Sequence, residues 1–247
     1  MALFEARELH LRFGDRVVLE NISLAFEAGC LSGIMGPNGA GKTTCFNVLT
    51  GRYRPDRGRV MFDGADITGR SPQAIARLGI ARSFQLMNLF DEFTVFENVA
   101  IALPQTRKRG ADPIGVAYGD AALVAEVHEI LDTVGLGERV DQIAKSLPYG
   151  ERRALEIAVA LASRPKLLFL DEPTAGLGSD GRARLAELVH RLKGQVTLVV
   201  IEHDMEFLFS LADVISVIHW GQVIAQGSPA ELRTNPWVKN SNLGKLA

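Results

Sequence analysis

Alternation of apolar and polar residues dominates the first part of the chain and predicts β-strands with one buried face. The alternation runs through residues 9–13 and again through residues 18–26, and the turn residues Gly14-Asp15 separate the two stretches. Residues 59–62 predict a further strand that ends at the tight-turn pair Asp63-Gly64. We therefore expect a small antiparallel β layer in the N-terminal part of the chain.

A helical pattern replaces this alternation in the middle of the chain. Ser71 is expected to cap a short helix, and an apolar strand is expected over residues 80–85. From residue 86 to residue 162 the apolar positions recur with helical spacing, including a helix capped by Asp120 and a second helix over residues 150–162. Residues 86–162 are therefore predicted to form an inserted helical subdomain.

Two runs of continuous apolar residues, 166–170 and 196–201, have the length of strands that are buried on both faces. An amphipathic helical pattern over residues 180–192 lies between them. Strand, helix and strand in this order predict a parallel sheet. The tail adds strand patterns within residues 214–225 and a last helix capped by Ser228.

Composition narrows the classes of protein that the chain can belong to. Its 247 residues are 47% hydrophobic, which is enough for a sizeable core. The net charge of −2 gives no indication of a nucleic-acid partner, so none is expected. Cys30 and Cys45 lack the spacing of a zinc site or a disulfide framework. No apolar run is long enough to cross a bilayer, so any membrane role is expected to be peripheral.

A glycine-rich loop between an apolar segment and an amphipathic one carries the strongest chemical signal. It follows the pattern G-x-x-x-x-G-K-[ST] of a phosphate-binding loop. The backbone N–H groups of such a loop bind phosphate oxygens, its lysine reaches the β- and γ-phosphates, and its hydroxyl group ligates Mg²⁺. The expected nucleotide-binding residues are Gly36, Pro37, Asn38, Gly39, Ala40, Gly41, Lys42, Thr43 and Thr44.

Further polar residues follow the predicted strands of the parallel sheet. Asp171 and Glu172 end an apolar strand, where the first carboxylate is suited to hold Mg²⁺ through water and the second to polarise an attacking water. His203 ends the next apolar strand, from which it can reach a γ-phosphate, and Gln85 is placed to orient Mg²⁺ or water. Phe13 is a candidate for stacking on an adenine ring, although an aromatic residue in a β layer also suits a core.

The order of these motifs resembles the nucleotide-binding subunits of ATP-binding cassette (ABC) transporters over essentially the whole chain. The resemblance assigns Phe13 to the adenine-stacking position, Gln85 to the glutamine switch and His203 to the histidine switch. It implies an α/β fold in which a P-loop NTPase core has a mainly parallel sheet, an N-terminal antiparallel β layer and an inserted helical subdomain. Residues 1–85 and 163–247 would form the nucleotide-binding core, and residues 86–162 the helical subdomain with the signature motif.

The family's signature motif, commonly Leu-Ser-Gly-Gly-Gln, is degenerate in this chain, where the matching residues are Leu147, Pro148, Tyr149, Gly150 and Glu151. Pro148 offers neither the hydroxyl group nor the N–H group that the family's serine would supply. We hypothesise that Pro148 starts a helix whose first amides, from Gly150 onward, still bind phosphate. Gly178 also departs from the family, which often has an aspartate there, and leaves slow turnover open.

The resemblance implies that two such subunits pack head to tail, with each ATP between the phosphate loop of one and the signature helix of the other. One chain would then hold two half-sites. The partner is either a copy of this chain or a nonidentical ATPase. The implied catalytic residues are Lys42, Gln85, Glu172 and His203; Thr43, Gln85 and Asp171 would hold Mg²⁺, and Gly150 and Glu151 would complete the partner's ATP site.

Residues 80–85, 90–99 and 201–205 are similar to ATPase subunits of branched-chain amino acid importers. Such a subunit sits peripherally on the cytoplasmic face of the plasma membrane under permease subunits, to which a separate solute-binding protein delivers the substrate. The permease contact is expected from Leu86 to Val95, where the apolar residues are Leu86, Met87, Leu89, Phe90 and Phe93. An importer of urea, short amides or other small carboxylates would use a similar ATPase, so the substrate stays open.

Three other classes of protein share some of these features. A soluble ABC-type ATPase of translation or DNA repair usually carries two cassettes, a coiled coil or zinc-binding cysteines, which this sequence lacks. A small-molecule kinase shares the phosphate loop but has no use for residues 147–151 or for His203. A regulatory cassette without hydrolysis is disfavoured by the joint presence of Lys42, Glu172 and His203.

Overall fold

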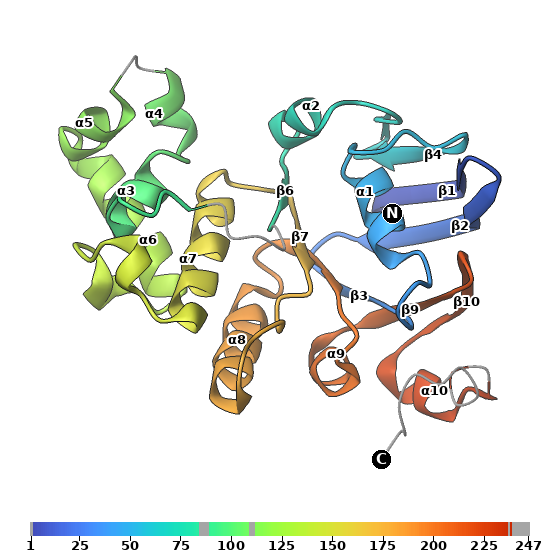
Figure 1. Ribbon diagram of the computed structural model, residues 1–247. Helices are drawn as coiled ribbons and strands as arrows, with labels where there is room; N and C mark the ends of the chain where they lie inside the picture. Colours follow the sequence, from blue (N-terminus) through green and yellow to red (C-terminus); the bar gives the residue numbers. More distant parts are fainter. Residues whose placement is uncertain (1, 84–88, 109–111, 237, 239–247) are drawn as a thin grey trace.

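The computed structural model describes residues 2–83, 89–108, 112–236 and 238. These residues form two β-sheets, and the helices pack beside them and extend away to one side (Figure 1). The α/β architecture with an antiparallel layer and a mainly parallel sheet is the one that the sequence predicts. No helix among the described residues combines the length and the apolar character that a membrane-spanning helix needs.

The antiparallel sheet has the strand order β2-β1-β4-β5. Its strands are β1 (Ala2–Phe13), β2 (Arg16–Glu27), β4 (Arg57–Phe62) and β5 (Ala65–Asp66). β1 starts earlier than the alternation at residue 9 indicates, because the register shifts between Ala6 and Leu9, where Glu8 has a φ of 51°. This bulge interrupts the alternation in the sequence although the strand continues.

The second sheet has the order β10-β9-β3-β8-β7-β6, and its neighbours are parallel except for the β9–β10 hairpin. Its strands are β3 (Leu31–Met35), β6 (Ile80–Arg82), β7 (Leu167–Asp171), β8 (Thr197–Ile201), β9 (Val214–His219) and β10 (Gln222–Gly227). Every residue of β3, β7 and β8 is buried, as the continuous apolar runs predict. The predicted end of the strand over residues 80–85 lies outside the described residues.

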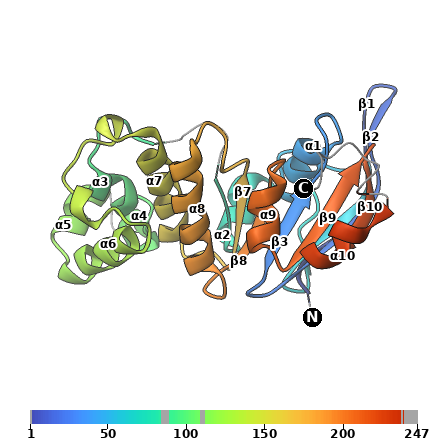
Figure 2. The same cartoon turned by 90° about the horizontal axis from the view of Figure 1, so that it is seen from below.

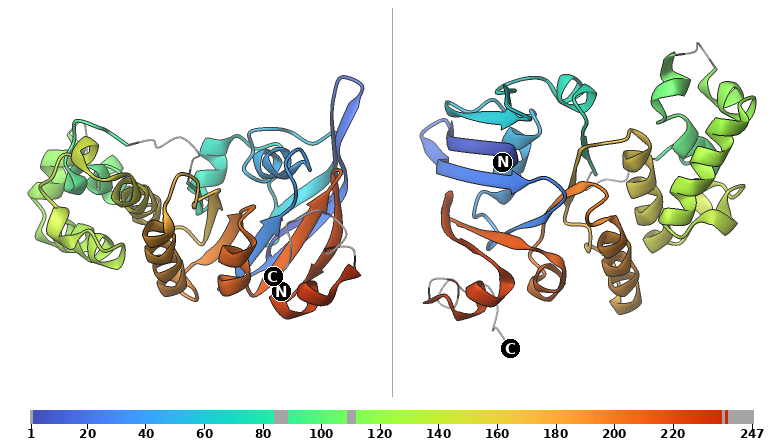
Figure 3. Two further views of the ribbon diagram at one scale, coloured as in Figure 1. Left: turned by 60° about the horizontal axis from the view of Figure 1, so that its bottom comes forward. Right: turned by 180° about the vertical axis from the view of Figure 1, so that it is seen from behind.

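The helices divide between the sheets and the helical region that Figures 2 and 3 show at one end of the molecule. Beside the sheets lie α1 (Lys42–Leu49), α2 (Pro72–Arg77), α8 (Ser179–Leu192), α9 (Met205–Leu211) and α10 (Pro229–Thr234). The helical region holds α3 (Val95–Ala100), α4 (Pro104–Lys108), α5 (Pro113–Tyr118), α6 (Ala121–Thr133), α7 (Tyr149–Ala162) and the 3₁₀ turns η1 (Gly137–Arg139) and η2 (Ala144–Ser146). The predicted caps are confirmed, since the side chains of Ser71, Asp120 and Ser228 accept hydrogen bonds from backbone N–H groups of α2, α6 and α10.

Two hydrophobic clusters cover the two faces of the parallel sheet. Along β7, Leu167 and Phe169 belong to the cluster between the sheets, while Leu168 and Leu170 belong to the cluster on the helix side. The helix-side cluster also contains residues of α3, α6 and α7. Because the core and the helical region share this cluster, the assignment of residues 86–162 to a separate subdomain stays a prediction.

Phe169 occupies the centre of the cluster between the sheets. Its ring centroid lies 5.6 Å from that of Phe4, 6.2 Å from that of Phe26 and 5.5 Å from that of Phe46, each in edge-to-face geometry. The side chain is fully buried. It therefore joins β1, β2 and α1 to the strand that ends at Asp171, directly before the predicted catalytic Glu172.

We predict that Phe169→Ala lowers the free energy of unfolding by about 3–5 kcal/mol, because it leaves a cavity among aromatic rings. Denaturation by urea measures this change. Val17→Ala is the control, since 58% of Val17 is exposed and the change should stay within about 0.5 kcal/mol. A loss below about 1 kcal/mol for Phe169→Ala would contradict this view of the core.

Candidate functional site

The phosphate loop joins the end of β3 to the start of α1 at Lys42. Gly39 and Gly41 have φ values of 79° and 102°, which favour glycine. A Cβ atom on Gly36 would lie 2.1 Å from the carbonyl oxygen of Ile218, whereas a Cβ atom on Gly39 would meet nothing within 4 Å. The loop is thus packed tightly on one side and open on the other, which is the shape that binding of a phosphate group requires.

Lys42 points back into this loop. Its Nζ atom donates hydrogen bonds to the carbonyl oxygens of Gly36, at 2.7 Å, and of Pro37, at 3.1 Å. The residue is only 6% exposed, and this burial lowers the pKa of the ammonium group, while Glu172, Glu202 and Asp171 oppose the shift. The lysine charge is held at the position where the sequence predicts contact with the β- and γ-phosphates.

Asp171 ends β7 beside Arg82, a partly buried arginine that the sequence analysis missed. Arg82 Nη2 lies 3.6 Å from Asp171 Oδ2, and Arg82 also donates to Asn47 Oδ1 at 3.0 Å and to Thr50 Oγ1 at 3.2 Å. Burial raises the pKa of Asp171 to about 6, although the Arg82 charge acts in the opposite direction. Among the described residues, none donates a hydrogen bond to the buried Oδ2 atom. The available signal for Arg82 was a charged residue within an apolar strand pattern.

Glu172 and His203 come together at the ends of two adjacent strands. Glu172 follows β7 with a φ of 45°, and its N–H donates to the carbonyl of Ile201 at 2.8 Å. Its Oε1 atom lies 3.9 Å from Nδ1 of His203, whose side chain is exposed. The structure thus brings a carboxylate and an imidazole to the edge of the sheet where the phosphate loop also begins.

Glu202 is a second residue that the sequence analysis missed. The side chain is fully buried, and its Oε1 atom accepts hydrogen bonds from the backbone N–H of Thr174, at 2.8 Å, and from the Thr174 hydroxyl group. Its Oε2 atom accepts from the N–H groups of His203, at 3.0 Å, and Asp204, at 3.3 Å. Glu202 therefore joins the loop after Glu172 to the loop that carries His203.

The other predicted residues of the nucleotide site lie as follows. Phe13 ends β1 with 49% of its surface exposed, and its ring meets that of Tyr53 edge to face at 5.4 Å between centroids. Thr43 and Thr44 lie in the first turn of α1, where Thr43 is exposed. Asn38 and Gly39 are exposed, and Ala40 is buried. Gln85 lies outside the described residues.

The signature residues lie at the start of α7. Pro148 is the N-cap, and α7 begins at Tyr149, so the prediction that Pro148 starts the helix is confirmed. Gly150 is exposed, and a Cβ atom there would meet only Leu177 Cδ2, at 3.7 Å. Glu151 Oε2 lies 3.4 Å from Arg139 Nε.

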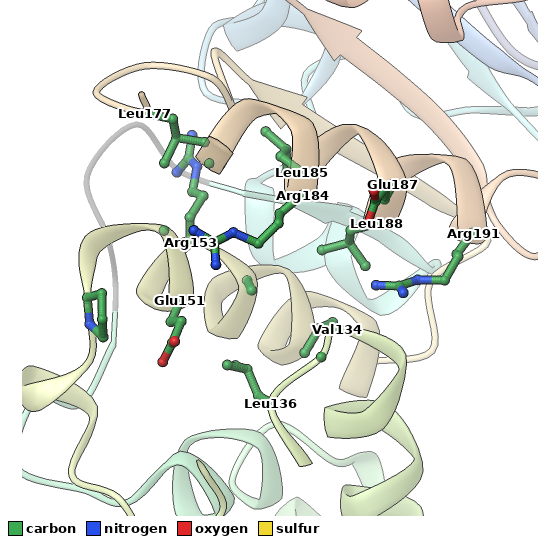
Figure 4. A pocket seen from close by; sticks show the side chains of 15 residues that line it. Val134, Leu136, Glu151, Arg153, Leu177, Arg184, Leu185, Glu187, Leu188 and Arg191 are labelled. Atoms are coloured by element: carbon green, nitrogen blue, oxygen red, sulfur yellow. The ribbon is translucent and has the colours of Figure 1, made fainter. Parts of the chain in front are cut away.

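The signature helix and the phosphate loop do not meet within one chain. Figures 1 and 2 show α7 and α1 on opposite sides of β7. Gly150 instead lines a cavity of about 360 Å³ between α7, α8 and the turn after α6, together with Leu136, Leu177 and Leu188 (Figure 4). The predicted contact between Gly150 and a nucleotide would therefore need the phosphate loop of a second chain.

Comparison with known proteins agrees with the fold. The ABC transporter family matches residues 19–175. The chain is 38% identical to the high-affinity branched-chain amino acid transport ATP-binding protein LivG of Salmonella typhimurium and 37% identical to BraF of Pseudomonas aeruginosa, which carries the same description, with 98% of each chain covered. The ADP conformation of MJ1267, an ATP-binding cassette of an ABC transporter, has a TM-score of 0.86 and 30% identity over 99% of this chain and 100% of that one.

The raised pKa of Asp171 predicts a pH dependence of stability. Folding raises this pKa from its usual 3.8 to about 6. The shift therefore favours the folded state below pH 3.8, where both states are protonated, and this contribution is lost as the pH rises through about 6.

We predict that the Asp171→Asn variant gains stability relative to the wild type between pH 4 and pH 7, by about 3 kcal/mol at 1.36 kcal/mol per pKa unit. Urea unfolding without nucleotide, repeated across this range, measures the difference. If the variant also loses stability because the contact with Arg82 is gone, that loss is the same at each pH and does not change how the stability difference varies with pH. Parallel stability profiles for the two proteins would contradict the prediction.

Proposed function

The chain belongs to the ABC transporter family, and we propose that it is the ATP-hydrolysing subunit of a membrane importer for branched-chain amino acids. The observation that carries the proposal is the convergence of Lys42, Asp171, Glu172 and His203 at one edge of the parallel sheet. An ATPase of this family couples the hydrolysis of ATP to transport. The substrate class follows from the descriptions of the LivG and BraF relatives and is part of the proposal.

In the proposed site the phosphate loop binds the triphosphate. The N–H groups at the start of α1 and the Lys42 ammonium group face the β- and γ-phosphates, for which Lys42 would exchange its hydrogen bonds to the loop carbonyls. The half-exposed ring of Phe13 would stack on adenine.

Mg²⁺ would neutralise charge on the phosphates. Thr43 and Asp171 would hold it, as would Gln85. Hydroxyl, carboxylate and amide oxygens are the ligands that Mg²⁺ prefers, and the buried Oδ2 atom of Asp171, with no hydrogen-bond donor among the described residues, fits such a role.

Glu172 and His203 would carry the hydrolytic step. The Glu172 carboxylate accepts the proton of the attacking water, and the exposed His203 imidazole contacts the γ-phosphate. Glu202 holds both loops in place through its four hydrogen bonds. Substitution of Glu172 should therefore lower ATP hydrolysis while ATP binding is kept.

A second cassette would complete the site. Gly150 and Glu151, at the positively polarised start of α7, would contact the ATP held by the partner's phosphate loop. The partner is a copy of this chain or a nonidentical ATPase. Exposure of Gly150 and the open space around it support this arrangement, because no described residue lies so close that position 150 requires a glycine.

The permease would contact residues 86–95. Leu86 and Met87 lie outside the described residues, but Phe90 is exposed and stacks on Phe93 at 5.1 Å between ring centroids. Asn98 fixes this turn, since it donates to the Phe90 carbonyl at 3.1 Å and accepts from the Phe90 N–H at 2.8 Å. Such a contact would place the chain peripherally on the cytoplasmic face of the plasma membrane, where a solute-binding protein acts only through the permease.

We predict that Glu172→Gln still binds ATP but lowers kcat by about 100-fold or more, because the base is lost while the phosphate contacts remain. Fluorescence titration with an ATP analogue measures binding, and phosphate release measures turnover. Size-exclusion chromatography with ATP should show a dimer that the wild type does not accumulate. Turnover within threefold of the wild type would remove Glu172 from this role.

The proposed substrate class is tested separately from the ATPase activity. Permease and solute-binding proteins encoded beside this chain are expected, and the purified binding protein should bind leucine, isoleucine or valine. Binding of urea or a short amide in place of these amino acids would keep the ATPase assignment and change the substrate.

A further inference from the structure

Arg153 is a buried arginine in the second turn of α7, three residues after Gly150. It is 3% exposed, and its guanidinium group reaches three consecutive backbone carbonyls at the end of β7. Nη2 donates to the oxygens of Asp171 and Glu172, each at 3.1 Å, and Nε donates to that of Pro173 at 3.4 Å. Nη1 pairs with Glu156 Oε2 at 2.5 Å on the same helix.

The three carbonyls converge because the chain turns at Glu172. In a regular strand successive carbonyls point in opposite directions, but Glu172 has a φ of 45°. This left-handed conformation is unfavourable for a residue with a side chain, and it persists only where its surroundings hold it. Arg153 supplies buried donors to the carbonyls of Asp171, Glu172 and Pro173 and so stabilises the turn that aims the Glu172 carboxylate.

A second hydrogen bond joins α7 to the segment after Glu172. The Tyr149 hydroxyl group donates to the Ala175 carbonyl at 3.2 Å. Gly176 has a φ of 77°, and a Cβ atom there would lie 3.1 Å from the Tyr149 ring. Arg153 and Leu177 line the same cavity between α7 and α8 (Figure 4). The first turns of α7 and residues 171–177 therefore behave as one packed unit.

We propose that Arg153 is a positioning residue for Glu172. Its guanidinium group holds the carbonyls of Asp171, Glu172 and Pro173, and these carbonyls set the direction of the Glu172 side chain. The proposal rests on the proposed function, in which Glu172 accepts the proton of the attacking water. Movement of residues 171–173 relative to α7 would displace the Glu172 carboxylate.

The chemistry explains why a small shift matters. General-base catalysis needs the carboxylate within hydrogen-bond reach of the attacking water, and misplacement by about 1 Å lowers a rate by about 100-fold. Lys42 donates to the carbonyls of Gly36 and Pro37, whereas Arg153 donates to the carbonyls of Asp171, Glu172 and Pro173. Loss of Arg153 should therefore lower hydrolysis while ATP affinity is kept.

A double-mutant cycle on the full-length chain tests this proposal. Arg153→Met should lower kcat about tenfold or more and change the ATP dissociation constant less than about threefold. In the Glu172→Gln background the same substitution should lower the residual rate less than about twofold, because a residue that acts through Glu172 has no further effect once the carboxylate is gone. Arg153→Lys keeps the charge but loses the planar fork of donors, so its kcat should lie between those of Arg153→Met and the wild type.

Arg164→Met is the matched control, since Arg164 follows α7 and pairs with Glu126 on the surface, and its kcat should stay within about twofold of the wild type. A folded Arg153→Met variant with wild-type kcat would overturn the proposal. Equal rate losses in both backgrounds would also overturn it. If Arg153→Met does not fold, the same double-mutant cycle is measured with Arg153→Lys. A wild-type kcat for Arg153→Lys, or equal rate losses in the two backgrounds, would then overturn the proposal. Absence of ATPase activity in the wild type would instead refute the proposed function.

Discussion

Parallel pairing of β3, β8 and β7 is the constraint on which the site depends. Ile34 pairs with Ile201, and Ile201 pairs with Asp171, so the three strands end at one edge of the sheet. Burial on both faces fixes this register, because a shift by one residue would exchange the side chains that fill the two hydrophobic clusters. The phosphate loop, Glu172 and His203 follow these strand ends directly and therefore meet although they are far apart in the sequence.

The same edge holds buried charges, each of which has a partner within the chain. Lys42 donates to loop carbonyls, Asp171 lies beside Arg82, and Glu202 accepts four hydrogen bonds. Burial of unpartnered charges would be strongly unfavourable, so these contacts allow the edge to form without a nucleotide. Binding of a triphosphate then exchanges existing hydrogen bonds for new ones, which suits a subunit that repeatedly binds and releases its nucleotide.

The sequence predicts the parts of this structure that depend on local chemistry. Glycine spacing defines the phosphate loop, continuous apolar runs predict β7 and β8, and side-chain caps start α2, α6 and α10. Arg82, Glu202 and Arg153 were missed because their partners come from other parts of the chain and no spacing rule connects them. The start of β1 was missed because a bulge at Glu8 breaks the alternation. The role proposed for Gly150 was suggested by family resemblance, since within one chain it does not lie against the phosphate loop.

The central claim is that each ATP site is shared between two chains, and complementation between two inactive variants tests it most directly. Lys42→Ala lacks the phosphate-loop lysine, and Gly150→Asp carries a negative charge where the partner's phosphates would lie. Ala121→Asp, in the exposed first turn of α6, is the control for an added aspartate at a helix start. Lys42→Ala and Gly150→Asp should each hydrolyse little ATP alone. An equal mixture of the two, in which dimers exchange subunits, should recover up to about a quarter of wild-type activity. This is because half of the dimers are mixed and each mixed dimer has one intact site out of two. A mixture that forms mixed dimers but stays inactive would contradict the account.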